Sequence, residues 1–280
     1  MAWNTTDSLE EFLAAAGGFL RADPVPHTVL LSVGASLRAG TRSYGDDAPY
    51  YGWWSSSDGT ARGALLCTPP YPVVLSQMPE EAAVALATTL AHQGRPVSGA
   101  TGGRTAAEGF GAAWQRRTGT VPRPDGTNRL YRLHEPVPPR PAPPGAARTA
   151  TSADRELLIA WFAAFAAEVS AGGGDQASAV DDKLEHGGVT LWEADGVPVS
   201  FAAVSRAVAG MVRVAPVYTP AGHRGRGYAG AVTTAAGRAA LDAGADEVLL
   251  FADLTNPTTN ALYQRIGYRP VEDHIGLSFD

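Results

Sequence analysis

The chain has 280 residues, 45% of them apolar, and a formal net charge of −6, which favours two domains with ordinary cores over one. Its longest apolar run, Leu157 to Ala167, is too short to span a membrane, and the acidic opening MAWNTTDSLEEF differs from a basic secretory signal, so we expect a cytoplasmic protein. Residues 1–145 carry 12 basic and 12 acidic side chains and residues 146–280 carry 10 and 16, a balance that argues against nucleic acid and suits a small cationic partner.

The first half of the chain is predicted to mix α and β structure. Helices are expected over residues 8–20, 28–37, 79–92 and 105–117, and strands over 50–54, 61–67, 73–76 and 128–134. The segments 50–54 and 61–67 flank SSSDGT, a pattern typical of a β-hairpin. Pro79 precedes two glutamates, which suits the first turn of a helix.

A proline-rich stretch divides the chain. Residues 135–145 read EPVPPRPAPPG, and their six prolines can neither continue a helix nor donate to a strand ladder. We predict a semi-rigid linker at 136–145 between an N-terminal domain at 1–135 and a C-terminal domain at 146–280. The change in charge at the same place favours this boundary, and a loop across the surface of one large domain is the alternative.

The second half alternates more regularly. Helices are expected from a cap at Thr151 to about Ser170 and over 179–186, 227–243 and 256–266, and strands over 189–194, 197–204, 211–218, 247–252 and within 269–279. Asp195-Gly196 between two of these strands is a strong hairpin signal. Strands that meet helices through short loops indicate a mixed sheet with helices on its faces.

A glycine-rich loop, HRGRGYAG at residues 223–230, lies between a strand ending near Tyr218 and a helix beginning near Gly227. The first four N–H groups of a helix have no partner within it and carry part of a positive charge. Glycines let a ligand come close to these groups, so we expect the loop to hold a phosphate or pyrophosphate. By itself the pattern also suits an ordinary loop, because its spacing is neither that of Walker A nor that of the dinucleotide fingerprint.

The downstream sequence decides between these readings. Residues 224–229, RGRGYA, match the R/Q-x-x-G-x-G/A signature of the GNAT superfamily of N-acetyltransferases, and Asn256, seven residues before Tyr263, and Ile266-Gly267-Tyr268 match its asparagine, tyrosine and L-G-F/Y segment. Residues 146–280 therefore resemble a GNAT N-acetyltransferase. The element order of the first half suggests a degenerate copy, so the expected fold class is α/β (α+β), a GNAT-like mixed and mostly antiparallel sheet in tandem, with one working site.

The resemblance implies acyl transfer from a coenzyme A thioester, usually acetyl-CoA, to an amine. It places the pyrophosphate on the loop amides and the pantetheine arm along the preceding strand. The cofactor-binding residues that it implies are Val217, Tyr218, Thr219, Arg224, Gly225, Arg226, Gly227, Tyr228, Ala229, Asn256 and Asn260. On spacing alone, Arg226 is a solvated side chain, Asn256 an N-cap and Asn260 a surface helix residue.

Two features argue against metal and thiol chemistry. Cys67 is the only cysteine, which excludes disulfides within the chain and thiolate metal clusters, and we interpret it as a small buried residue. The six histidines lack the i, i+4 spacing of a helical metal pair. We expect no metal.

Attack on the thioester needs a base, because an amine with a pKa near 10.4 is ammonium at pH 7. Glu168 is the first candidate, since it shares helical spacing with Leu158, Trp161 and Phe165 and places an acid on an otherwise apolar stripe. The alternative is that Glu168 marks the exposed end of that stripe. Glu193 and Asp253 are weaker candidates.

Tyr263 is the predicted general acid. A phenol with a pKa near 10 stays protonated at pH 7 and can protonate a thiolate leaving group. On spacing alone, Tyr263 packs one helix face beside Leu262 and Ile266, and only the family resemblance makes it catalytic.

We therefore expect an acetyl-CoA-dependent N-acetyltransferase of a small, cationic primary amine, with no nucleic-acid or membrane partner. An aromatic group in the first half either lines the acceptor pocket or packs a core: Tyr44, Tyr50, Tyr51, Trp53 and Trp54. The loop SGATGGR at 98–104 lacks the family's spacing and is interpreted as a plain loop. Two other functions stay open, a non-catalytic acyl-CoA-binding or sensing module and an N-acetyltransferase of proteins or peptides.

Overall fold

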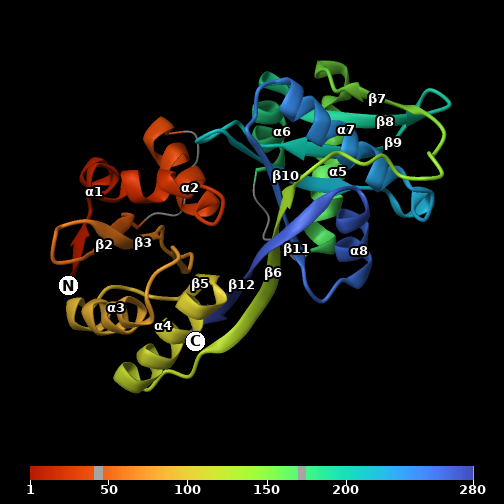
Figure 1. Cartoon of the computed structure of the whole chain (residues 1–280). Coiled ribbons are helices and arrows are strands. Elements are labelled where there is room, and N and C mark those ends of the chain that lie inside the picture. Colours follow the sequence, from red (N-terminus) through yellow and green to blue (C-terminus); the bar gives the residue numbers. More distant parts are fainter. Residues whose placement is uncertain (41–46, 170–174, 280) are drawn as a thin grey trace. The chain divides into compact units, whose positions relative to one another are not determined.

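The computed structural model describes residues 1–40, 47–169 and 175–279, and the chain folds into two compact units (Figure 1). Unit 1 comprises Met1–Leu130, Phe251–Thr255 and the residues from Val271 onward, and unit 2 comprises Tyr131–Leu250 and Asn256–Pro270. The division falls within three strands, namely β6 (Arg123–Leu133), β11 (Glu247–Asp253) and β12 (Tyr268–Ser278).

Unit 1 is a sheet with helices on both faces. Its other elements are β1 (Ala2–Thr6), α1 (Leu9–Ala22), α2 (Thr28–Ala39), β2 (Tyr50–Ser55), β3 (Ala61–Cys67), β4 (Val73–Leu75), α3 (Glu80–Gln93), β5 (Gly99–Gly103) and α4 (Arg104–Thr118). Strands β1 to β5 lie in sequential order, antiparallel except for the parallel pair β4 and β5, and β12 pairs antiparallel with β5. Successive strand residues face opposite sides of a sheet. Tyr50 packs in the core that contains α3 and α4, whereas Tyr51 stacks on Phe12 of α1.

Helices α3 and α4 pack in one core of unit 1 and lie side by side (Figure 1). Leu86 and Leu90 of α3 are buried at helical i, i+4 spacing, as are Phe110 and Trp114 of α4. Gly94 ends α3 in the left-handed conformation, which glycine adopts without steric penalty. The apolar spacing and the cap explain why the predicted helices 79–92 and 105–117 are confirmed.

Unit 2 repeats the element order of unit 1. It contains β7 (Ala146–Thr149), the 3₁₀ turn η1 (Ser152–Asp154), α5 (Arg155–Glu168), α6 (Gln176–Glu185), β8 (Val189–Ala194), β9 (Val197–Val204), β10 (Met211–Tyr218), the 3₁₀ turn η2 (Ala221–His223), α7 (Tyr228–Asp242) and α8 (Pro257–Arg265). The strand order is β7-β8-β9-β10-β11, antiparallel except for the parallel pair β10 and β11. Both units therefore run strand, two helices, hairpin, strand, helix, parallel strand, helix and strand. The expected tandem of a mixed, mostly antiparallel fold is confirmed.

Helices α5 and α7 cover opposite faces of the unit 2 sheet. Leu191 of β8 packs in one core with Phe162 of α5, and the next residue, Trp192, packs against Tyr228 of α7. Because neighbouring strand residues point to opposite faces, the two helices lie on different sides. Helix α7 is thereby fixed by its first residue, at the end where the glycine-rich loop enters it.

The two units differ from the predicted domains. Residues 131–145 belong to unit 2, and the segment predicted as a semi-rigid linker contacts neighbouring segments of that unit. The backbone N–H of Val137 donates to the carbonyl of Ile266, and the indole of Trp192 donates to the carbonyl of Pro144. The residues from Val271 onward belong to unit 1 because β12 pairs with β5. Amino-acid composition does not show which distant segments pair with each other. The prolines therefore indicated a junction in this region but did not fix where it lies.

Residues 98–104 were expected to be a loop, but Gly99–Gly103 form strand β5. The glycines allow neighbouring backbones to come close: a Cβ on Gly99 would lie 2.2 Å from the carbonyl oxygen of Leu277, and one on Gly102 would lie 2.8 Å from that of Leu75. Glycine has a low β propensity, which is why this strand was missed. The short strands β1 and β7 were also missed.

The start of α5 is held by a buried carboxylate. Asp154 accepts hydrogen bonds from the guanidinium of Arg148 at 2.7 and 2.8 Å and from the backbone N–H of Thr151 at 2.8 Å. Asp154 is only 8% exposed, and the bonds from Arg148 lower its pKa to about 2. A lowered carboxyl pKa adds stability above the unfolded-state pKa near 3.9, and this stability is lost as the pH falls toward 2.

We therefore expect Asp154→Asn to lower the free energy of unfolding by about 1–2 kcal/mol at pH 7, a value reduced for the partial exposure of Arg148. The loss of stability between pH 4 and pH 2 should be smaller in the variant than in the wild type. Urea unfolding at several pH values measures both effects. Asp181→Asn, in an exposed pair with Arg155, is the matched control and should change neither quantity measurably. Equal stability of the wild type and Asp154→Asn at pH 7 would contradict this account.

Three further features bear on function class. None of the helices in the described ranges is long and apolar enough to cross a membrane. Cys67 is free and buried, as expected, and burial raises the pKa of its thiol. Among the residues that the structure describes, no group of three or more His, Cys, Asp or Glu side chains could hold a metal ion.

Candidate active site

Strands β10 and β11 are paired over a short distance. Within unit 2, Met211–Arg213 pair with Glu247–Leu249, whereas β10 continues to Tyr218. On its other side, β10 pairs with β9 through a bulge between Val214 and Val217, and a bulge interrupts the ladder and bends the strand. The backbone of the last β10 residues is therefore available on the side that faces away from β9. The predicted pantetheine-binding residues Val217 and Tyr218 lie on this segment.

The segment from Thr219 to Gly227 connects β10 to α7. Gly225 and Gly227 have φ angles of 75° and 85°, a left-handed backbone that glycine adopts readily. Gly227 is the N-cap of α7 and provides no side-chain cap. Among the described hydrogen bonds, the backbone N–H groups of residues 225–230 have no acceptor. A row of free N–H groups at a helix N-terminus binds anions, so the loop fits the diphosphate of coenzyme A.

Two of the predicted site residues contact each other. Nη2 of Arg224 donates to both carboxylate oxygens of Glu168 at 2.6 and 2.8 Å, and its Nε donates to the carbonyl of Thr219 at 2.8 Å. The guanidinium also lies 5.7 Å from the ring centroid of Tyr218. These contacts hold the guanidinium of Arg224 in place. Its positive charge is paired with the carboxylate of Glu168, the predicted base. Arg226 is exposed and has no ion-pair partner among the described residues.

This ion pair makes a testable prediction. Both side chains are 47% exposed, and exposed pairs contribute up to about 1 kcal/mol. If phosphate competes with Glu168 for Arg224, Glu168→Gln should tighten coenzyme A binding about two- to fivefold in a calorimetric titration. Glu156→Gln, at the other end of α5, removes an exposed pair with Arg155 and should leave the affinity unchanged. A weaker coenzyme A affinity in Glu168→Gln would contradict the proposed competition between phosphate and Glu168 for Arg224.

The side chains of three predicted cofactor-binding residues are engaged in contacts within the protein. Tyr228 is 4% exposed and lies in a small core with Val199, and the ring of Tyr218 packs in the core of α5. The hydroxyl of Thr219 is hydrogen-bonded to that of Ser200 at 2.8 Å. Only the backbone groups of Tyr218, Thr219 and Tyr228 are therefore free to contact a cofactor.

The proline-rich segment passes the N-terminus of α7. A Cβ on Gly227 would lie 3.7 Å from Pro143, and one on Gly230 would lie 3.9 Å from Pro139. The hydroxyl of Thr234, one turn further along α7, donates to the carbonyl of Val137 at 3.3 Å. The segment thus forms one wall beside the loop, a contact that the sequence pattern did not reveal.

The predicted asparagines of α8 have structural partners. The side-chain oxygen of Asn256 accepts from the backbone N–H of Thr259 at 3.1 Å, so Asn256 is the N-cap that spacing alone suggests. Asn260 is 9% exposed, not the surface residue that spacing suggests. Its amide donates to the carbonyl of Asn256 at 2.7 Å and its oxygen accepts from the hydroxyl of Tyr131 at 2.8 Å. Both asparagines order α8, and sequence reasoning missed Tyr131, a fully buried residue of β6 that carries no motif.

Tyr263 lies among aromatic rings on α8. Its ring centroid is 6.3 Å from that of Tyr131 and 5.9 Å from that of Tyr268. Burial raises the pKa of Tyr263 to about 12, and its hydroxyl has no hydrogen-bond partner among the described residues. The neighbouring Leu262 packs against Gly230, where a Cβ would lie 3.1 Å away. Tyr263 is therefore on the helix that packs beside the first turn of α7.

The Ile266-Gly267-Tyr268 segment has a packing reason. Gly267 has a φ angle of 103°, and a Cβ there would lie 1.7 Å from the carbonyl oxygen of Glu135. No larger residue fits without moving the backbone. The glycine lets the chain turn directly from α8 into β12, which fixes the end of the helix that carries Tyr263.

The weaker base candidates are also engaged. Glu193 forms an ion pair with Arg148 at 2.9 Å. Asp253 accepts from the backbone N–H of Thr255 at 2.8 Å, which caps the following turn.

Most of the aromatic group in unit 1 is packed. Tyr50, Tyr51 and Trp54 are 1%, 3% and 6% exposed, and Trp53 is partly exposed. Tyr44 lies outside the described residues. The buried members of this group belong to the core, which favours the packing interpretation over an acceptor pocket.

The described part of unit 1 has no equivalent of the glycine loop. The segment that joins β4 to α3, in the place where the loop joins β10 to α7, is only Ser76 to Pro79. Helix α3 begins with Glu80 and Glu81, and acidic side chains at a helix N-terminus oppose anion binding. These features favour a single diphosphate site in the chain, in unit 2.

Comparisons with known proteins agree with this geometry. Residues 155–268 match the acetyltransferase (GNAT) family. None of the curated proteins matches the chain. Solved structures with a similar fold include a GNAT-family acetyltransferase from Colwellia psychrerythraea (12% identity, 100% of both chains, TM-score 0.62) and a GCN5-related N-acetyltransferase from Sphaerobacter thermophilus (16% identity, 98% of this chain and 94% of that one, TM-score 0.64).

A third similar structure is described as a tandem GNAT protein from the clavulanic acid biosynthesis pathway (13% identity, 98% of this chain and 97% of that one, TM-score 0.58). At these identities the likeness shows the fold, and that fold extends over both units. The family match covers the glycine loop, α7 and α8 together. Residues 155–268 of this chain are an acetyltransferase domain of the GNAT family.

Proposed function

We propose that the protein transfers an acetyl group from acetyl-CoA to a primary amine of a small, cationic acceptor. Acyl transfer from an acyl-CoA follows from the family, and the acetyl group and the acceptor are the proposed part. The observation that carries the proposal is the glycine loop, whose free N–H groups at residues 225–230 follow a strand that parts from its neighbour. The acidic excess of residues 146–280 supports a cationic acceptor.

The residues of unit 2 have separate roles in this proposal. The backbone N–H groups of Gly225 to Ala229 hold the diphosphate, and the open edge of β10 at Val217 orients the pantetheine arm. When bound, the cosubstrate supplies an activated thioester. Arg224 adds a positive charge, which forms an ion pair with the carboxylate of Glu168 in the free protein. Binding of phosphate to Arg224 releases this carboxylate, which then acts as a base directly or through water.

Tyr263 acts as the general acid. Its hydroxyl has no described hydrogen-bond partner, and burial keeps the pKa at about 12. The phenol is therefore protonated at neutral pH and can supply a proton to the thiolate as it leaves. The helix that carries Tyr263 packs beside the first turn of α7 through Leu262, which supports this role.

The test is thiol release from acetyl-CoA in the presence of a panel of amines that differ in charge and size. We expect turnover with small primary amines and none with alcohols of the same shape. A second candidate, a non-catalytic acyl-CoA sensor, is favoured by the ion pair that engages Glu168 in the free protein. Tight binding of acetyl-CoA with no turnover on any amine would contradict the proposed enzymatic function and support the sensor function.

A further inference from the structure

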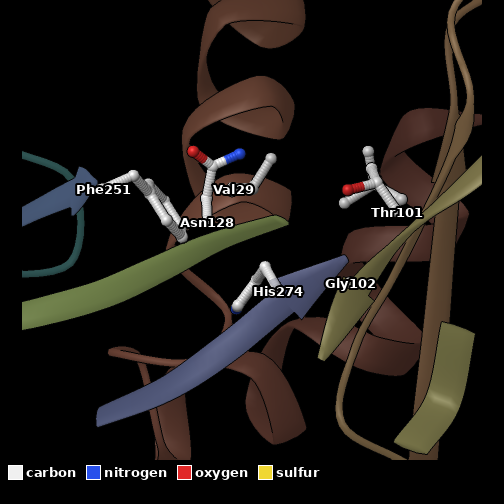
Figure 2. Close-up of a pocket in the computed structure, with 7 residues that line it drawn as sticks. Val29, Thr101, Gly102, Asn128, Phe251 and His274 are labelled. Atoms are coloured by element: carbon white, nitrogen blue, oxygen red, sulfur yellow. The ribbon is translucent and has the colours of Figure 1, made fainter. Parts of the chain in front are cut away.

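Unit 1 contains a pocket of about 160 Å³ (Figure 2). A water molecule takes roughly 30 Å³ in the liquid, so the pocket has room for about five water molecules or a molecule of similar size. The lining residues come from α2, β4, β5, β6, β11 and β12: Val29, Val74, Thr101, Gly102, Asn128, Phe251 and His274. All of them belong to unit 1.

The pocket has three polar groups, at Thr101, Asn128 and His274. Neither the hydroxyl of Thr101 nor the amide of Asn128 has a hydrogen-bond partner among the residues described. Figure 2 shows Thr101 across the pocket from Asn128 and Val29. Two such groups in one pocket, beside His274, are the arrangement expected of a ligand site.

His274 is oriented by a carboxylate. Its Nε2 lies 2.8 Å from Oε1 of Glu272, and its ring packs edge-on against Phe251 with 5.0 Å between centroids. Burial raises the pKa of Glu272, but hydrogen bonds from His274 and Gln77 outweigh it and hold that pKa below its usual range. The carboxylate of Glu272 accepts the hydrogen bond from Nε2–H, which leaves Nδ1 as the other hydrogen-bonding atom of the ring. Nδ1 has no partner in the described part of the chain.

The charge around the pocket favours a cation. No lysine or arginine lines it. The nearby Arg129 forms a bidentate pair with Asp273, and Arg104 pairs with Glu108, whereas Glu272 adds a negative charge behind His274. An anion would find no counter-charge, and desolvating it would be costly. The remaining wall is apolar, formed by Val29, Val74 and Phe251.

We propose that this pocket binds a small primary ammonium ion with a short aliphatic chain. The ammonium donates hydrogen bonds to acceptor atoms of the pocket's polar groups, such as the hydroxyl oxygen of Thr101 and the amide oxygen of Asn128, and the chain packs on the apolar wall. Phe251 adds an aromatic ring, which attracts cations. The site is separate from the glycine loop of unit 2, and its occupation does not depend on coenzyme A.

The test uses three probes of the same shape and different charge: n-butylammonium, n-butanol and butyrate. Each is titrated into the full-length protein without coenzyme A, and binding is followed by NMR shifts of residues that line the pocket. We expect n-butylammonium to bind at least tenfold more tightly than n-butanol and butyrate not to bind. Equal binding of butylammonium and butanol, a preference for butyrate, or no shift with any probe would overturn the proposal.

Two variants test the polar groups of the pocket. Thr101→Val keeps the shape of a β5 residue and removes one acceptor, so butylammonium should bind about tenfold more weakly. Asn128 is exposed, so Asn128→Asp should fold normally and bind butylammonium several-fold more tightly. Thr89→Val is the matched control, because the Thr89 hydroxyl bonds only to its own helix at Ala85. Unchanged binding in both pocket variants would overturn the assignment.

This result stands apart from the proposed acyl transfer. Amine binding in the absence of turnover would support the proposed unit 1 site and contradict the proposed enzymatic function. Turnover with no amine bound at Thr101 and Asn128 would support the enzymatic function and contradict the proposed site.

Discussion

Replacing Tyr263 by phenylalanine should lower kcat for acyl transfer by about 10²- to 10⁴-fold, the range of general acid catalysis. Coenzyme A affinity should change less than twofold, because the loop amides rather than the phenol hold the diphosphate. The reason is the leaving group: without a proton donor the thiolate must leave as an anion. Steady-state kinetics of thiol release and a calorimetric titration of the same variant measure the two quantities.

Tyr268→Phe is the matched control for this result. The Tyr268 hydroxyl is buried without a hydrogen-bond partner among the residues described, and its ring meets that of Tyr263 edge-on. Removing an unsatisfied buried hydroxyl should leave kcat unchanged and stability equal or higher. Equal kcat in Tyr263→Phe and the wild type would remove Tyr263 from the mechanism.

The pH dependence gives a second readout on Tyr263. Burial raises its pKa to about 12, and a general acid works while it is protonated. The kcat of the wild type should therefore not fall on the alkaline side until the pH approaches that value. An alkaline limb near pH 9 that disappears in Tyr263→Phe would contradict the raised pKa.

Replacing Gly227 by valine should weaken coenzyme A binding by at least 100-fold. Gly227 has a φ angle of 85°, which a β-branched residue adopts at a cost of about 1–3 kcal/mol. A Cβ at Gly227 would reach nothing in the protein closer than Pro143 at 3.7 Å, so the fold has room for it. Gly227 also lies within the row of residues whose free N–H groups are expected to hold the diphosphate, so a side chain there would hinder the ligand's approach.

Gly244→Val separates strain from ligand contact. Gly244 lies just past the other end of α7 with a φ angle of 94° and nothing within 4 Å of its Cβ position. This variant should lose stability to a similar extent and keep its coenzyme A affinity. Similar affinity losses in both variants would mean that backbone strain, rather than the loop, explains the effect of Gly227→Val.

Local signals in the sequence were reliable where geometry is set by a few neighbouring residues. Asp195 and Gly196 both have positive φ angles, 53° and 75°, as the predicted two-residue hairpin requires. Thr151 and Asp154 form the capping box that begins η1. The glycine loop lies between β10 and α7 as expected, because positive-φ glycines and an apolar helix face are both visible in the sequence.

Pairing between distant segments was not predictable. The last strand, β12, pairs with β5 in unit 1, and nothing in its composition distinguishes that partner from another strand. Asn260 looked like a surface residue until Tyr131, 129 positions earlier, proved to be its hydrogen-bond donor. The pocket residues run from Val29 to His274, and they share neither a motif nor a periodic spacing.

The side chains of a matched motif also need the fold before their roles can be assigned. Tyr228 occupies a signature position, yet its ring is buried and only its N–H faces the loop. Glu168 lies close to the loop through its pair with Arg224. If Arg224 binds phosphate as proposed, a carboxylate that holds it has a reason to be there apart from base catalysis, and the coenzyme A affinity and turnover of Glu168→Gln separate the two roles.

The central claim is that the loop from Arg224 to Ala229 holds the diphosphate of coenzyme A. Calorimetric titration of the full-length protein with coenzyme A, at low and at moderate salt, tests it most directly. We predict one site per chain, because unit 1 lacks the loop, and weaker binding at higher salt, because charge is involved. The absence of saturable heat, or two equivalent sites per chain, would contradict the account.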